Sequence, residues 1–222
     1  MKIDILTLFP EAFTPLQTSI LGRAVENGVL EINVINIRDF SLDKHKKCDD
    51  YPFGGGAGML MTVQPLFDAI KSVKTDNSKI VFPSPIGKTF CAKKAESLSK
   101  EEHLIFVCGH YEGVDDRIFQ LFEIEQISIG DFVVTGGELP TMIIIDAVAR
   151  FLDGVISKES LDCESFSNGL LEYPQYTRPQ EFQGLKVPEV LLSGNHQEVD
   201  KWRKQQSLLR TKNLRKDLLE NK

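Results

Sequence analysis

The sequence predicts an α/β protein with a largely parallel sheet, followed by a smaller helical region. Up to about residue 152, short apolar runs typical of strands alternate with segments of helical spacing, which is the order expected of a parallel sheet covered by helices. Two of the runs, IVF at 80–82 and LIFV at 104–107, are apolar throughout, as in strands that are buried on both faces. After Gly154 this alternation stops.

The elements of the first region follow from local patterns along the chain. The polar, glycine-rich stretch 38–59 predicts an irregular loop, and loops of that length in compact domains are usually functional or mobile. Gly28 suits a helix C-cap, and Pro65 suits the first turn of a helix. Apolar patterning predicts strands at 2–8, 29–37, 79–85, 103–109, 123–130 and 131–137, and helices at 17–28, 63–73, 89–99, 114–122 and 138–152.

The end of the chain has a different character. Residues 155–195 contain proline- and glycine-bearing motifs that predict a linker and an irregular segment. From His196 onward, the spacing of Val199, Trp202 and Leu209 predicts a helix with basic residues on its outer side. We therefore divide the chain into a first domain at 1–154, an interdomain linker at 155–172 and a C-terminal helical domain at 173–222.

Composition excludes several classes of protein. The four cysteines are far apart and form no CxxC pair or Cys/His cluster, so we expect no zinc site and a reducing, cytoplasmic environment. The N-terminal segment carries Asp4 and Glu11 around a short apolar run, which is wrong for a signal peptide. No apolar run approaches the roughly 18 residues of a membrane span.

Charge is distributed unevenly along the chain. The net charge of the whole chain is −6, which by itself argues against nucleic acid as a partner. Residues 201–222, however, hold eight Lys and Arg against two Asp and Glu. A basic end on an acidic body can bind phosphate locally, and the alternative is an ordinary solvated helix.

Three predicted strand ends carry loops suited to a ligand: FPSPIG at 82–87, CGHYEG at 108–113 and SIGDFVVTGGELP at 128–140. In open α/β sheets ligands lie beyond the carboxyl ends of strands, and glycine lets the backbone approach them. No glycine fingerprint follows the first strand, and GGGAGM at 54–59 lacks the Lys-Ser or Lys-Thr pair of a Walker A loop. This last loop follows a basic run, KHKK at 44–47, and is either flexible or anion-binding.

The segment ELPTMIIIDAVARF predicts a helix that is apolar almost all round, and we expect such a helix to be buried. Asp146 and Arg150 are its interior charges, four residues apart. Either they form a structural ion pair, or Arg150 is presented at a site or a subunit interface.

Five motifs in register resemble the bacterial tRNA (guanine-37-N1)-methyltransferases, the TrmD family. They are YPFGGGAGMLMTVQP, CGHYEGVDDR, ISIGDFVVTGGELPTMIIIDAVARF, ESFSNGLLEYPQYTRP and VPEVLLSGNH, and the match runs in order from the first strand to the basic tail. The resemblance implies a SPOUT-type α/β domain with a deep trefoil knot, an obligate homodimer, S-adenosyl-L-methionine (AdoMet) as methyl donor, and a C-terminal domain that helps to hold tRNA. It also implies a target guanosine at tRNA position 37, preceded by a guanosine at 36.

The motifs carry the family's site onto particular residues. The RNA contacts expected are Gly58, His45, Arg178, Arg203 and Arg210. The resemblance further implies that Mg²⁺ supports activity, although no ligand set is evident in the sequence. The AdoMet contacts expected are Ser84, Pro85, Gly109, Tyr111, Glu112, Gly113, Ile129, Gly130, Asp131, Phe132, Val133, Val134, Gly136, Gly137 and Pro140.

The expected catalytic residues are a carboxylate and Arg150. The carboxylate takes the N1 proton of guanine, and Arg150 either stabilises charge near O6 or orients the carboxylate. The family usually has Asp before the Ser-Phe of the linker motif, and this chain has Glu164 there, with Asp162 as a second candidate. Two other interpretations of the sequence remain: a non-catalytic RNA-binding dimer that keeps the knot, and a nucleotide-hydrolysing enzyme that uses GGGAGM.

Overall fold

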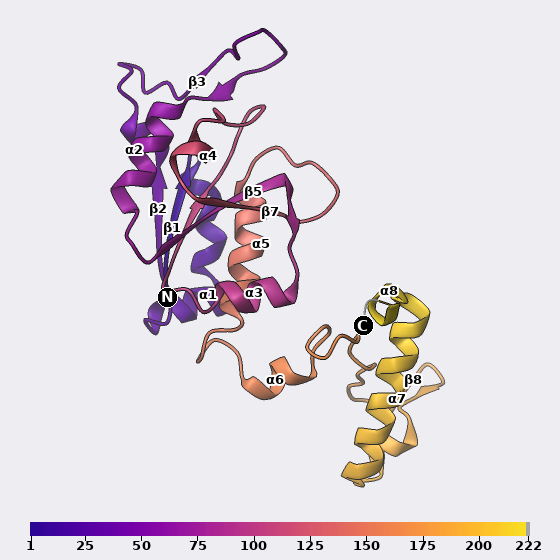
Figure 1. Cartoon of the computed structure of the whole chain (residues 1–222). Helices are drawn as coiled ribbons and strands as arrows, with labels where there is room; N and C mark the ends of the chain where they lie inside the picture. Colours follow the sequence, from indigo (N-terminus) through magenta and orange to yellow (C-terminus); the bar gives the residue numbers. More distant parts are fainter. Residues whose placement is uncertain (221–222) are drawn as a thin grey trace. The chain divides into compact units, whose positions relative to one another are not determined.

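The computed structural model describes residues 1–220. The chain forms two compact units, Met1–Ile156 and Ser157–Lys222. Figure 1 shows the first as a sheet with helices around it and the second as a small, mainly helical body.

The first unit is built on a five-stranded sheet whose strands are all parallel, with the order β2-β1-β6-β5-β7. The central strand β6 is buried along its whole length, which agrees with its unbroken apolar sequence. The prediction of an α/β fold with a parallel sheet is therefore confirmed. The strands are β1 (Lys2–Thr7), β2 (Glu31–Asn36), β5 (Ser78–Thr89), β6 (His103–Val107) and β7 (Ile124–Ser128).

Helices cover both faces of this sheet, and each face has its own apolar core. Alternate strand residues such as Ile5 and Phe106 pack with α1, α3 and α5 on one face. Their neighbours Leu6 and Ile105 pack with α2 and α4 on the other, as expected from the alternation of side chains along a strand. The helical elements are η1 (Pro10–Gln17), α1 (Ser19–Glu26), η2 (Ile37–Phe40), α2 (Val63–Val73), α3 (Ala92–Leu98), α4 (Ile118–Leu121) and α5 (Glu138–Ala149).

Three expectations for this unit are wrong. Residues 131–137 form no strand and run as an irregular loop from β7 to α5. The helix expected at 114–122 is reduced to the single turn of α4. The residues before it form a turn in which the backbone N–H of Arg117 donates to the Asp115 carboxylate. The helix α5 is not buried all round, since Leu139 is 59% and Ile143 is 51% exposed.

The long stretch 38–59 is only partly irregular. It begins within η2 and contains β3 (Asp49–Asp50), which pairs in antiparallel fashion with β4 (Leu60–Met61). The segment 51–59 is therefore the loop of a short β-hairpin. Figure 1 shows this loop at the end of the sheet opposite the N-terminus, which is the end where the parallel strands finish.

The second unit is organised around the helix α7 (His196–Leu214), where the sequence predicts a helix. The Asn195 side chain caps its start by accepting a hydrogen bond from Glu198 N. Thr211 is fully buried and accepts a hydrogen bond from Leu171 N at 2.8 Å. Leu209, expected on the inner face, is instead 51% exposed. The other elements are α6 (Lys158–Cys163), β8 (Glu181–Phe182), β9 (Leu185–Lys186), η3 (Glu189–Leu192) and α8 (Asp217–Glu220).

Candidate functional site

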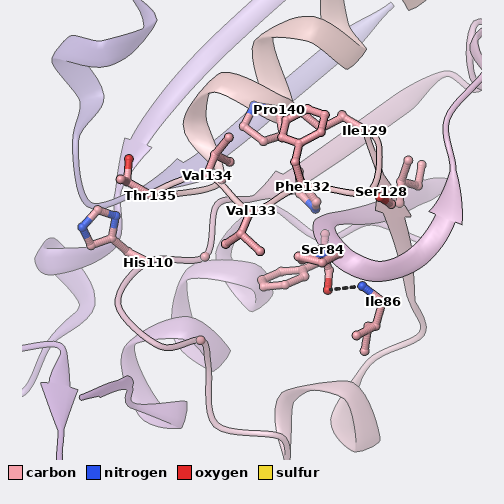
Figure 2. Close-up of a pocket in the computed structure, with 18 of the residues that line it drawn as sticks. Ser84, Ile86, His110, Ser128, Ile129, Phe132, Val133, Val134, Thr135 and Pro140 are labelled. Carbon is pink, nitrogen blue, oxygen red and sulfur yellow. Dashed lines mark hydrogen bonds between the residues drawn. The ribbon is translucent and has the colours of Figure 1, made fainter. Parts of the chain in front are cut away.

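A cavity of about 380 Å³ lies at the carboxyl ends of β6 and β7 and beside residues 82–86 within β5. It is the place where the three glycine- and proline-bearing loops of the sequence meet, as expected for an open parallel sheet. Figure 2 shows His110 and Thr135 at one end of it, Ser84 and Ile86 at the other, and Phe132, Val133 and Val134 between them. Its lining comprises Phe82, Pro83, Ser84, Pro85, Ile86, Gly109, His110, Tyr111, Glu112, Gly113, Ile127, Ser128, Ile129, Gly130, Phe132, Val133, Val134, Thr135, Gly136, Gly137 and Pro140.

The first wall of the cavity comes from an excursion within β5. Pro83 pairs with Ile127, and Lys88 pairs with the same residue, so the four residues between them leave the ladder and return to it. The backbone N–H of Ile86 donates to Ser84 Oγ within this excursion (Figure 2). A Cβ at Gly87 would lie 2.4 Å from the backbone of Gln126. Glycine is therefore required for the return of the strand.

The other two walls are the loop after β6 and the loop after β7, and their backbones are in contact with each other. The N–H of Gly137 donates to the carbonyl of Gly109 at 2.8 Å. A Cβ on Gly137 would lie 2.8 Å from Gly109 N and 2.9 Å from the Cα of Cys108. The glycine pair 136–137 thus closes the loop that follows β7 against the end of β6, on the cavity that the excursion in β5 also lines.

A buried carboxylate supports the polar end of the cavity. Glu138 is 8% exposed and accepts a hydrogen bond from Thr7 Oγ1 at 2.8 Å. It lies in the first turn of α5, where the helix dipole favours a negative charge. The Nδ1 atom of His110 is buried and has no hydrogen-bond partner among the described residues. His110 Nδ1 is therefore a buried polar atom at this end of the cavity that no described residue hydrogen-bonds.

Cys108 directly follows β6 and precedes the lining residue Gly109. The thiol is fully buried, and burial raises its pKa far above the ordinary value, although a hydrogen bond with Thr141 Oγ1 opposes the shift. The protonated thiol is a poor nucleophile. The site therefore offers no cysteine for covalent catalysis.

The cavity brings together every expected cofactor residue except Asp131, which is exposed and outside the lining. Seven residues of the lining were not expected from the sequence. His110 lies inside the motif CGHYEG and was detectable there. The others carry no chemical signal of their own and belong to the lining because of the excursion in β5 and the loop after β7: Phe82, Pro83, Ile86, Ile127, Ser128 and Thr135.

The hairpin β3–β4 is tied to one wall of this cavity. Glu112 N donates to Met59 O at 3.0 Å, and Met61 N donates to Gly113 O at 2.9 Å. Gly58 has a φ of +77°, and a Cβ there would lie 2.4 Å from Glu112 Cγ. The expected RNA contact Gly58 is therefore packed against a cavity residue.

His45 lies in an exposed turn before the hairpin. The backbone N–H groups of His45 and Lys47 donate to the Asp43 carboxylate and lower its pKa. The carboxylate thus closes the turn, and the side chains of Lys44 and His45 remain exposed.

The remaining expected residues are divided between the units. Arg150 is the half-buried C-cap residue of α5, and its N–H bonds to the carbonyl of Asp146. Asp146 is exposed and makes no ion pair within residues 1–220, so the expected alternative of a structural pair with Arg150 is not found. Glu164 is the half-buried C-cap residue of α6, and Asp162 within α6 is exposed.

The expected RNA-binding arginines of the second unit have different environments. Arg178 is exposed. Arg203 stacks on Tyr173, with its guanidinium carbon 4.9 Å from the ring centroid, and Arg210 Nη1 donates to Glu172 O at 3.4 Å. Arg203 and Arg210 thus fasten the segment around 172 to α7.

Four other cations on and beyond α7 are exposed. They are Lys201, Lys204, Lys212 and Lys216, and none of them makes a side-chain ion pair in the described part of the chain.

Two kinds of feature are absent from residues 1–220. No group of three or more His, Cys, Asp or Glu side chains is placed there to hold a metal ion. No helix among these residues has the length and apolar character needed to cross a membrane.

Comparison with known proteins agrees with the motifs. The family model described as tRNA (Guanine-1)-methyltransferase TrmD matches residues 1–221. A protein of Clostridium perfringens strain 13, named tRNA (guanine-N(1)-)-methyltransferase, is 60% identical over 222 residues, covering 99% of this chain and 94% of that protein. A protein of the same name from Clostridium botulinum strain Langeland is 57% identical over 220 residues, covering 98% of this chain and 91% of its own. The family resemblance is thereby confirmed: the chain belongs to the tRNA (guanine-1)-methyltransferase TrmD family.

Proposed function

We propose that this protein transfers a methyl group from AdoMet to N1 of guanosine-37 in the anticodon loop of tRNA, with a preference for a preceding guanosine. Membership of a family of tRNA guanine-N1 methyltransferases supports the reaction and the class of substrate. The observation that carries the proposal is the cavity, because two of the family motifs, CGHYEGVDDR and ISIGDFVVTGGELPTMIIIDAVARF, converge on it together with the FPSPIG loop. The donor, position 37 and the preceding guanosine rest on those motifs.

The cavity suits a nucleoside cofactor in size and chemistry. Its volume of about 380 Å³ lies within the usual range for small-molecule sites. Phe132, Val133 and Pro140 offer apolar surface to a base, and the glycines of the lining let the backbone come close to it. When bound, AdoMet supplies an electrophilic methyl group on a positively charged sulfur.

The residues of this chain then handle the proton and the charge of guanine. Neutral guanine carries a proton on N1, so N1 is a poor nucleophile until a base takes that proton. We assign this role to Glu164, with Asp162 as the alternative, and we assign to Arg150 the stabilisation of negative charge on O6 or the orientation of the base. A requirement for Mg²⁺ stays a prediction that EDTA in the assay tests.

The same proposal covers assembly and domain roles. We assign residues 1–154 to an AdoMet-binding SPOUT domain with a trefoil knot, 155–172 to a linker and 173–222 to a tRNA-binding domain in a cytoplasmic homodimer. Leu139 and Ile143 support the dimer, because both are large apolar side chains that lie one turn apart on α5 and are exposed. Sedimentation equilibrium of the purified chain tests the dimer.

The test of the function is methyl transfer from labelled AdoMet to two tRNA transcripts. One transcript carries guanosine at positions 36 and 37, and the other has adenosine at 37. Label in the first alone is the expected result. If AdoMet binds and neither transcript is labelled, the protein is a non-catalytic RNA-binding dimer; stabilisation by ATP in place of AdoMet would instead favour a nucleotide-hydrolysing enzyme.

The four unpaired lysines on and beyond α7 give a further prediction. Replacing Lys201, Lys204, Lys212 and Lys216 with glutamine should weaken tRNA binding and lower the slope of log affinity against log salt by about one for each phosphate that these lysines neutralise. AdoMet affinity should not change. Replacing the exposed Lys93 of α3 is the matched control, and an unchanged salt slope in the quadruple variant would contradict a role for α7 in binding RNA.

A further inference from the structure

The loop of the β3–β4 hairpin exposes two large aromatic side chains to solvent. Phe53 is 103% exposed and Tyr51 is 75% exposed. Around them lie Gly54, Gly55, Gly56 and Gly58, all with positive φ. A Cβ added at Gly54 or Gly55 would meet nothing within 4 Å. The tip of the hairpin therefore stands clear of the rest of its unit, and Phe53 gains nothing from packing there.

Cations lie in the turn just before this hairpin. Lys44, His45 and Lys47 are exposed, and none of them forms a side-chain ion pair within residues 1–220. The nearby acidic groups make local contacts. Asp43 accepts the backbone N–H groups of the turn, and Asp39 pairs with Lys46 at 2.6 Å. Asp49 accepts a hydrogen bond from Tyr111 Oη at 3.5 Å, and Asp50 accepts one from Tyr51 N at 2.8 Å. The segment 44–53 thus contains both exposed cationic side chains and exposed aromatic rings.

This combination is the one by which proteins bind single-stranded nucleic acid. Basic side chains follow the phosphates, and aromatic rings stack on unpaired bases. The base of the hairpin is fixed to the cavity wall by the hydrogen bonds from Glu112 N and Met61 N. A nucleotide stacked on the loop would therefore lie next to the cavity and on the side of Gly58.

We propose that Phe53 is a stacking platform for an unpaired base of the bound RNA, with Tyr51 beside it and the 44–47 turn holding the adjoining phosphates. The proposal deepens the assigned function and rests on it, because it takes an anticodon loop as the ligand. The glycines give the loop the freedom to bring the ring onto a base, and the exposed ring binds without giving up any packing in the free protein.

The test measures binding of the unmodified tRNA transcript to the full-length protein, with a series at position 53. Phe53→Ala should weaken RNA binding by about tenfold, as expected for the loss of one stacked base. Phe53→Tyr and Phe53→Trp should keep wild-type affinity, and Phe53→Leu should behave like the alanine variant, because leucine has no aromatic face. AdoMet affinity should not change throughout. Leu121→Ala, at an exposed apolar residue of α4, is the matched control.

A spectroscopic measurement separates stacking from general damage. The chain contains one tryptophan, Trp202, so Phe53→Trp in a Trp202→Phe background places the only indole on the hairpin. RNA should quench its fluorescence with the same midpoint as in the binding curve. Unchanged affinity of Phe53→Ala, full affinity of Phe53→Leu, or no quenching would each overturn the proposal.

Two further outcomes are informative about alternatives. If Phe53→Ala shifts the protein from dimer to monomer in sedimentation equilibrium, the ring belongs to a subunit interface and the proposal is wrong. Because the readout is RNA binding, the proposal is judged even if the wild-type protein fails to methylate guanosine-37. In that case the assigned reaction is wrong, and the RNA-binding affinities of the Phe53 variants still decide whether the ring stacks on a base.

Discussion

Replacing Glu164 with glutamine is expected to lower kcat for methyl transfer by about 10²–10⁴-fold, the usual contribution of a positioned general base. Glutamine keeps the shape of the side chain and removes its ability to take the N1 proton. Glu164 belongs to the second unit and does not line the cavity of the first, so AdoMet affinity should stay within about twofold. Single-turnover methylation and calorimetric titration of AdoMet measure the two quantities.

The neighbouring carboxylate provides the matched control for this experiment. Asp162 is exposed and lies two residues before Glu164. Asp162→Asn removes its negative charge and should leave kcat nearly unchanged. The opposite pattern, with loss of activity in Asp162→Asn alone, would assign the base to Asp162. Full activity in both variants would show that neither carboxylate takes the proton. Glu164→Asp adds a second comparison, because it restores the residue that the family usually has and should retain most activity.

Replacing Gly137 with alanine is expected to destabilise the protein by about 1–3 kcal/mol or more and to abolish AdoMet binding. The backbone at Gly137 is helical, with a φ of −78°, so alanine brings no backbone strain. The cost is steric: the new Cβ would lie 2.8 Å from Gly109 N and 2.9 Å from the Cα of Cys108, and backbone atoms cannot move aside easily. The two loops would part and the cavity would open. Thermal denaturation with and without AdoMet measures both effects.

Gly136 is the control for this prediction. A Cβ there would meet the Oε2 atom of Glu138 and the Nδ1 atom of His110, which are side-chain atoms and not backbone atoms. Gly136→Ala should therefore cost less stability than Gly137→Ala and should weaken AdoMet binding without abolishing it. Equal melting temperatures for wild type and Gly137→Ala would show that the backbone contact between the two loops does not hold the cavity together.

Part of the fold was predictable because it depends on local pattern. The unbroken apolar sequence of β6 indicated a strand buried on both faces, and β6 is the central strand of the sheet. The helical spacing of 63–73 predicted α2 to the residue. Residues 131–137 were wrongly expected to be a strand. Their apolar side chains, such as Val133 at 81% exposure, line a cavity, and their backbone does not pair with a sheet.

The sequence by itself determined the family, the parallel α/β class and the loops that form the candidate site, because these depend on residue types and their order. Only the tertiary structure decided what those loops do to one another. It showed that Gly137 closes against Gly109, that β5 leaves its ladder and returns, and that His110 Nδ1 is left open. It also showed Phe53 in full exposure. These facts depend on contacts between residues distant in the chain, which no local pattern contains.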